Sequence, residues 1–140
     1  MGWQSGIFVN SDMAAEYGID LSTVKTLEDY TQVLAVVKEK SAAAGKDVIG
    51  ISGLDFNLAV PYESLTGQPT LPGAYAVSEY GYFQDQEGVF NQYETQEYMD
   101  YCTLVHGWYN NGYISKDPVN YDSDTANRDN DFKNGNLFSY

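Results

Sequence analysis

The sequence predicts an α/β fold in which a small sheet carries flanking helices and helical residues predominate. Three observations lead to this prediction. Residues 7–51 follow a strand–helix–strand order, a long helical pattern starts after Thr95, and a last helical pattern precedes the apolar pair Leu137–Phe138. Hydrophobic residues make up 43% of the 140-residue chain, which is enough to build a packed core. We therefore expect residues 1–140 to form a single domain.

The first predicted elements are a short strand and a short helix. Residues 7–9, Ile-Phe-Val, are an apolar run that predicts a buried strand. Residues 10–12 offer polar side chains that can cap a helix, and Gly18 ends the helical pattern of residues 13–17.

A longer helix is predicted to begin after Thr26, which acts as its N-cap. Asp29 stands where a capping box usually has Glu. The buried stripe of this helix is expected to consist of Leu27, Tyr30, Leu34 and Val37. Gly45 ends the helix, and residues 48–51 predict a second buried strand.

The middle of the chain carries weaker patterns. Residues 52–57 are expected to form a loop that leads into a helix at 58–65. Two prolines and two glycines within residues 67–73 mark a break. Aromatic residues alternate with small and polar ones through residues 74–93, which predicts a hairpin or irregular strands.

A long helix is expected to start at the Thr95 cap and to stop at Asn111–Gly112. Its predicted core face consists of Tyr98, Tyr101, Cys102, Val105, Trp108 and Tyr109. Trp108 on this stripe is interpreted as structural.

The last predicted helix is capped by Ser123 or Asp124 and ends at Gly135. A strand then begins at Leu137. Because the sequence stops on the opening residues of this strand, we expect the chain to be a fragment of a longer protein.

Charge is distributed unevenly along the chain. The formal net charge is −13, with −2 in residues 1–46 (six acids, four lysines) and −11 in residues 47–140 (fourteen acids, three bases). Such a surface repels phosphate backbones and anionic lipid, so nucleic acid is not an expected partner. The chain has no apolar run long enough to span a bilayer and no signal-peptide pattern at its start.

Cys102 is the single cysteine, so no intramolecular disulfide can form, and a buried apolar thiol is the favoured interpretation. His106 lies four residues along the same helix. A pair of this kind without a third orienting group is weak evidence for a nucleophile.

Two acidic triplets, residues 122–124 and 129–131, suggest a calcium loop, but the spacing does not fit. An EF-hand loop that starts at Asp122 needs Gly at its sixth position and Glu at its twelfth. This chain has Asn127 and Lys133 at those positions. The sequence also contains no phosphate-binding glycine loop, no serine elbow and no CxxC pair. We expect no metal, no cofactor and no catalytic residue.

Three stretches match motifs of one known family in order and spacing. Residues 6–13 (GIFVNSDM) and 25–30 (KTLEDY) resemble a strand, an N-x-D helix start and a KTWEEL helix opening, with Leu27 in place of Trp. Residues 94–114 resemble a helix with the pattern T-x-E-x…W-Y-x-x-G-x-I. Residues 131–136 (DFKNGN) resemble F-x-x-G-x-A before a strand that crosses back between lobes, although Leu137–Phe138 replace the usual small residues. The family is that of extracellular solute-binding proteins for sugars (family 1), and the likeness is strongest to the lipoprotein members of Gram-positive bacteria.

The resemblance implies a periplasmic-binding-protein-like lobe, with residues 1–140 forming most of the second lobe of a two-lobed receptor. The first lobe would lie outside this chain. Such a receptor binds a carbohydrate in the cleft between its lobes and delivers it to the transmembrane permease subunits of an ABC importer. The resemblance further implies an extracytoplasmic lipoprotein, anchored on the outer face of the membrane by a segment outside this chain, and no enzymatic activity.

The resemblance places two segments at the edge of the cleft, namely the residues before the first strand and the loop after the second. Trp3 would stack on a sugar ring, or else pack as a terminal residue on an apolar edge. Asp55 and Asn57 would bond sugar hydroxyls, cap the helix near residue 58, or do both. Phe56 is a candidate stacking face or core anchor. The weaker candidates are Tyr62, Tyr75, Tyr80 and Tyr82, because eleven of the thirteen tyrosines lie at or after position 62.

Three other functions stay open on the sequence. A receptor of the same architecture for peptides or other solutes fits the same patterns. A glycoside hydrolase fragment needs two carboxylates about 5–10 Å apart beside an aromatic platform, and no spacing singles out such a pair. An interaction domain would use the acidic, tyrosine-rich surface directly.

Overall fold

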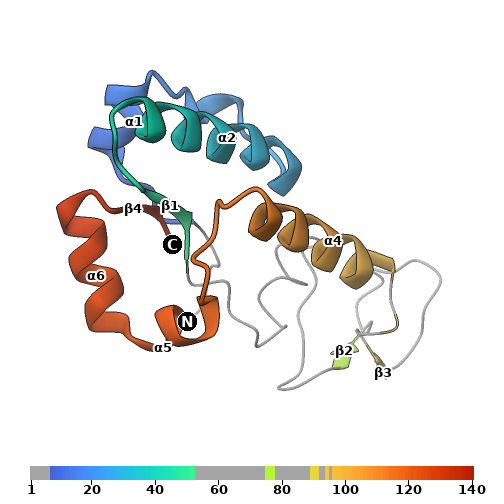
Figure 1. The fold of residues 1–140 in the computed structure, drawn as a ribbon. Coiled ribbons are helices and arrows are strands. Elements are labelled where there is room, and N and C mark those ends of the chain that lie inside the picture. Colours follow the sequence, from blue (N-terminus) through green and yellow to red (C-terminus); the bar gives the residue numbers. More distant parts are fainter. Residues whose placement is uncertain (1–6, 53–74, 78–88, 92–93, 95) are drawn as a thin grey trace, which may run out of the picture. The chain divides into compact units, whose positions relative to one another are not determined.

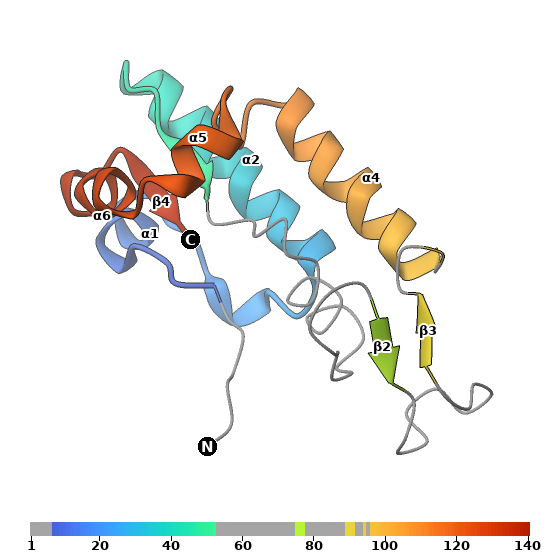
Figure 2. The same ribbon diagram turned by 90° about the horizontal axis from the view of Figure 1, so that it is seen from below.

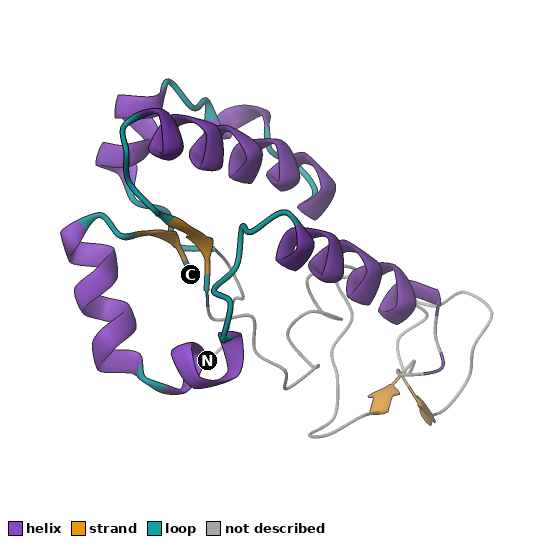
Figure 3. Cartoon of the chain, in the orientation of Figure 1, coloured by secondary structure: helices purple, strands orange, loops and turns teal. Residues whose placement is uncertain are grey.

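The computed structural model of the chain describes residues 7–52, 75–77, 89–91, 94 and 96–140. The chain divides into two compact units. The sheet unit comprises Ile7–Leu54 and His106–Tyr140, and the hairpin unit comprises Met1–Gly6 and Asp55–Val105. Most of the described residues belong to the sheet unit, and helices dominate it (Figure 3).

The sheet unit is built on two parallel strands, β1 (Ile49–Ile51) and β4 (Leu137–Ser139), in which Ile49 pairs with Leu137 and Ile51 with Ser139. On the other side of β4 the segment 8–10 runs antiparallel to it and forms a bridge between Val9 and Ser139. The predicted strand–helix–strand order is confirmed for the helix and for β1, whereas the segment 8–10 contributes an isolated bridge rather than a strand. This segment and β1 do not pair with each other, because β4 lies between them.

The expectation that residues 7–9 form a buried strand is wrong. Phe8 is 67% exposed and Ile7 is also exposed, while Val9 is half-buried. The segment pairs with β4, and no described strand pairs with its other side. β1, by contrast, packs against helix α2, and its residue Ile51 is buried.

Helix α1 (Ser11–Tyr17) begins where the sequence predicts. The Asn10 side chain accepts a hydrogen bond from the Met13 amide at 3.1 Å, and Gly18 ends the helix in the left-handed conformation. A short 3₁₀ turn, η1 (Leu21–Thr23), follows with Asp20 as its cap. Asn10 and Gly18 thus set the two ends of α1.

Helix α2 (Leu27–Ala43) has the predicted capping box, in which Thr26 and Asp29 each accept a hydrogen bond from the other's backbone amide at 3.0 Å. These bonds hold the pKa of Asp29 below its usual value, mainly through the amides of residues 25 and 26. The predicted stripe is confirmed at Tyr30, Leu34 and Val37, which are buried, whereas Leu27 is half-buried.

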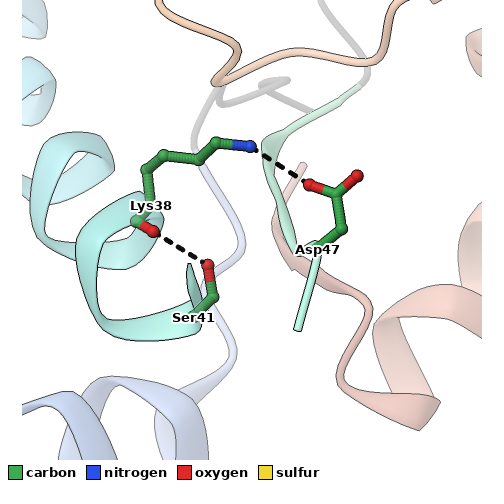
Figure 4. A network of polar contacts seen from close by, with 3 residues as sticks. All are labelled: Lys38, Ser41 and Asp47. Carbon is green, nitrogen blue, oxygen red and sulfur yellow. Dashed lines mark hydrogen bonds and ion pairs between the residues drawn. The ribbon is translucent and has the colours of Figure 1, made fainter. Parts of the chain in front are cut away.

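Near its end, α2 contacts the segment before β1 through one ion pair and carries one internal side-chain hydrogen bond (Figure 4). Lys38 Nζ lies 3.1 Å from Asp47 Oδ1, and the Ser41 hydroxyl donates to the Lys38 carbonyl at 3.2 Å. The Asp47 side chain is 89% exposed, so water screens this ion pair and its contribution to stability is small.

Three helices complete the chain: α4 (Gln96–Asn110), α5 (Pro118–Ser123) and α6 (Thr125–Asn134). Asp124 caps α6 through a 3.0 Å bond from the Asn127 amide, and Gly135 ends it at φ +73°, as predicted. Helix α5 was not predicted. Pro118 stands at its first turn, where proline suits a helix start.

The core of the sheet unit lies between α1 and α2 on one side of the β1–β4 pair and α5 and α6 on the other (Figure 1). Leu137 and Phe138 are fully buried in it, so the bulky residues that depart from the family motif fill the core. Trp108 is 1% exposed, packs edge-on to Tyr30 and donates from Nε1 to the Thr31 hydroxyl at 2.8 Å. The structural role predicted for Trp108 is confirmed.

In the hairpin unit, β2 (Tyr75–Val77) and β3 (Val89–Asn91) pair antiparallel and lie side by side (Figure 2). This confirms a hairpin within residues 74–93. Helix α4 begins in this unit and ends in the sheet unit.

The predicted core face of α4 holds only in part. Tyr101 and Trp108 are buried, and Tyr98, Cys102 and Val105 are half-buried, so the thiol is less enclosed than expected. Tyr109 is exposed, and its hydroxyl donates to the Lys116 carbonyl at 3.3 Å. Tyr109 follows Trp108 directly, and successive residues of a helix point about 100° apart, so Tyr109 lies off the buried face that carries Trp108.

Candidate ligand-binding edge

One edge of the small sheet collects three chain segments. Because β1 and β4 are parallel and the segment 8–10 is antiparallel to them, both strands end where that segment begins. The Ser52 amide donates to the Ser139 carbonyl at 3.0 Å, just past the end of β1. Phe8 and Tyr140 exchange two backbone hydrogen bonds, at 2.7 and 3.0 Å. We refer to Phe8, Ser52 and Tyr140 as the strand-end edge.

Aromatic rings gather at the strand-end edge. The rings of Phe8 and Tyr140 are stacked, with centroids 5.6 Å apart and an interplanar angle of 25°. Phe132 of α6 meets Tyr140 edge-on at 5.0 Å. Both arrangements are the favoured geometries of aromatic pairs. The ring of Tyr140 is therefore held between two others, while Phe8 remains largely open to solvent.

A guanidinium completes this aromatic cluster. Arg128, the single arginine of the sequence, lies on α6 with its central carbon 4.9 Å from the centre of the Tyr140 ring, within cation–π range. Its Nε is buried and makes no hydrogen bond, and Asp129 Oδ1 lies 3.9 Å away from it. The contact with the ring is thus a principal interaction of this side chain.

Buried polar contacts fix the strands beneath the edge. The Ser139 hydroxyl donates to the Gly50 carbonyl at 2.8 Å, and the Asn10 side-chain amide donates to the Phe132 carbonyl at 3.2 Å. The hydroxyl of Tyr30 is buried and makes no hydrogen bond of good geometry, although Ser139 lies near it. Burial raises the pKa of Tyr30 to about 12, and the neighbouring Ser139 offsets part of the rise.

Most residues predicted to contact ligand lie outside the described residues: Trp3, Asp55, Phe56, Asn57, Tyr62, Tyr80 and Tyr82. Tyr75 lies in β2, where its backbone pairs with Asn91. The two segments predicted at the cleft edge adjoin described residues, since residues 1–6 precede Ile7 and residues 53–57 follow Ser52. Their contacts with ligand stay predictions.

Sequence reasoning did not select Phe8, Tyr140 or Arg128 as site residues. Phe8 lies inside an apolar run of three and looks like a core residue, and Tyr140 is one of thirteen tyrosines. Arg128 could have been selected from the sequence, because it is the single arginine in a strongly acidic chain.

Among the described residues, no group of three or more histidine, cysteine or acidic side chains is arranged to hold a metal ion. No helix in the described part of the chain has the length and apolar character needed to cross a membrane.

The class of protein is indicated by two comparisons, which confirm the resemblance to solute-binding proteins of ABC transporters and the corresponding α/β fold class. No family model matches the chain. A carbohydrate ABC transporter substrate-binding protein of Streptococcus pneumoniae serotype 4 is 30% identical over 119 residues, covering 81% of this chain and 21% of that protein.

A solved structure gives the same result. The crystal structure of an N-glycan transport solute binding protein from Streptococcus pneumoniae matches with a TM-score of 0.56 and 25% identity, over 81% of this chain and 23% of that one. This chain therefore spans between a fifth and a quarter of the length of each relative.

Proposed function

We propose that the chain forms part of the substrate-binding component of an ABC importer and helps to bind a carbohydrate. The match to a carbohydrate ABC transporter substrate-binding protein over 81% of the chain carries this proposal. The match covers about a fifth of that protein, which is less than one of two lobes, so we assign the chain to part of the second lobe of a two-lobed receptor. The ligand would be enclosed when the other lobe closes on it.

The strand-end edge supports this function by its position and its chemistry. In open α/β sheets, ligands bind outside the carboxyl ends of the strands. Sugars present apolar ring faces and polar rims, so their sites combine aromatic faces with hydrogen-bonding groups. The edge supplies aromatic rings. Asp55 and Asn57 stay the partners of sugar hydroxyls that the family resemblance predicts.

The proposed role involves binding and release, with no bond of the solute broken. Both relatives are named as solute-binding proteins rather than enzymes. In this role the protein acts outside the cytoplasm, held at the outer face of the membrane as a lipoprotein, and passes its ligand to the permease subunits.

The decisive test is a ligand screen on the complete receptor, expressed with the first lobe. Melting temperature is measured with oligosaccharides, beginning with N-glycan-type sugars because of the structural relative, and with peptides of similar mass. A sugar at 100 times its Kd should stabilise the receptor by about 2.7 kcal/mol. A shift with peptides and none with any sugar would contradict the carbohydrate assignment.

The 140-residue chain alone should bind the same sugar weakly, because half of the cleft is missing. Titration calorimetry on the isolated chain is expected to give no micromolar affinity. Micromolar binding by the chain alone would contradict the two-lobed site.

A further inference from the structure

We propose that Phe8 is a stacking contact for a sugar ring, with Tyr140 as the backing ring that holds it in place. This inference rests on the proposed carbohydrate-binding function and names a residue of that same site. It starts from the position of Phe8 at the strand-end edge, where the segment 8–10 begins beside the ends of β1 and β4.

The ring of Phe8 is fixed before any ligand arrives. Its backbone donates to Tyr140 and accepts from Tyr140, at 2.7 and 3.0 Å, so the residue is anchored on both sides. The Tyr140 ring stacks on it and is itself held by Phe132 and Arg128. A rigid ring loses little conformational freedom when a ligand binds, which favours affinity.

Phe8 is more exposed than Tyr109, the other exposed aromatic residue among the described residues of the sheet unit, at 67% against 45%. Phe8 is 67% exposed and Val119 is 64% exposed, but Val119 is aliphatic and has no flat face. The π-face of an aromatic ring attracts the C–H face of a pyranose. A flat exposed ring therefore fits a sugar better than an aliphatic side chain does.

Arg128 is a positioning residue in this scheme. Its Nε is buried, and its guanidinium lies over the Tyr140 ring rather than beside Phe8. It would act by holding Tyr140 in the orientation that supports Phe8.

The test uses the complete receptor and the trimannosyl-chitobiose core of N-glycans, with Kd measured by titration calorimetry. Phe8→Leu keeps the apolar bulk and removes the flat ring, and we expect it to raise Kd about three- to tenfold. Phe8→Tyr keeps the ring and should bind within twofold of the wild type. Val119→Ala, at an equally exposed apolar site, should leave Kd unchanged.

The outcomes separate this inference from the function on which it rests. If the wild-type receptor binds neither this core nor any other sugar of the screen, the proposed function fails. If it binds a sugar and Phe8→Leu binds that sugar equally well, only the role of Phe8 fails. A Phe8→Leu variant that melts at lower temperature with an unchanged Kd would show that the rest of the receptor covers this ring, which also overturns the inference.

Discussion

Gly50 has the shortest contacts of the described glycines, and adding one methyl group there should destabilise the fold. A Cβ at this position would lie 2.9 Å from Leu34 Cδ2 and 3.0 Å from the Tyr113 carbonyl oxygen. Leu34 is fully buried, and the Tyr113 carbonyl accepts hydrogen bonds from the amides of Gly50 and Ile51 at 2.9 and 3.1 Å. Neither neighbour can move without disturbing the packing of α2 or the attachment of β1.

Two effects of Gly50→Ala oppose each other. Replacing glycine by alanine where the backbone tolerates it stabilises a protein by about 0.4–1 kcal/mol, through the unfolded state. Overpacking a filled core costs about 1–3 kcal/mol. The clash is the larger effect, so we expect Gly50→Ala to lower the free energy of unfolding by about 1–2 kcal/mol.

Gly107 in α4 provides the matched control. No atom lies within 4 Å of a Cβ built there, and an interior helical glycine costs about 0.5–1 kcal/mol relative to alanine. Gly107→Ala should therefore raise the free energy of unfolding by about that amount. Urea denaturation followed by circular dichroism measures both variants. A Gly50→Ala variant as stable as Gly107→Ala would refute the packing described around β1.

Substitutions at three further positions test the buried polar groups and the cap of α2. Thr31→Val removes the acceptor of the Trp108 indole and should cost about 1–3 kcal/mol in urea denaturation, whereas Thr31→Ser should restore most of it. Because the pKa of Tyr30 is raised to about 12, the wild type should lose about 2 kcal/mol of stability as pH rises from 10 to 12. Tyr30→Phe should remove that part of the loss, and an unchanged pH profile in this variant would contradict the reasoning. Thr26→Ala should cost about 1 kcal/mol, and no loss would count against the capping box.

The helices were the most predictable part of this fold, because their signals are local. Asn10 and Gly18 set the ends of α1, and Thr26 starts α2, through hydrogen bonds within a few residues of sequence. Helix α5 is only six residues long, too short for a periodic pattern to emerge, and was missed.

Strand pairing could not be read from the sequence in the same way. Residues 7–9 and 49–51 are both short apolar runs, and nothing in either run states which partner it takes. The pairing depends on β4, about 90 residues beyond β1 in the sequence. β4 lies between β1 and the segment 8–10 and pairs with both. Pairing across such distances is decided by packing of the whole unit rather than by local preference.

The same distance explains why the sequence pointed to residues before the first predicted strand and after the second, and did not select Phe8 or Tyr140. The family motifs place the cleft next to the first two strands, which led to Trp3 and Asp55–Asn57. Phe8 becomes a candidate only when its 67% exposure is known, and the sequence of an apolar run does not show that exposure. Tyr140 and Arg128 become candidates only through their contacts, since Tyr140 stacks on Phe8 and Arg128 lies over the Tyr140 ring. The stacking of an exposed Phe8 ring on Tyr140 is produced by the fold and is not visible in the sequence. Its contribution to sugar affinity is best measured against Val119, which has a similar exposure and no aromatic ring.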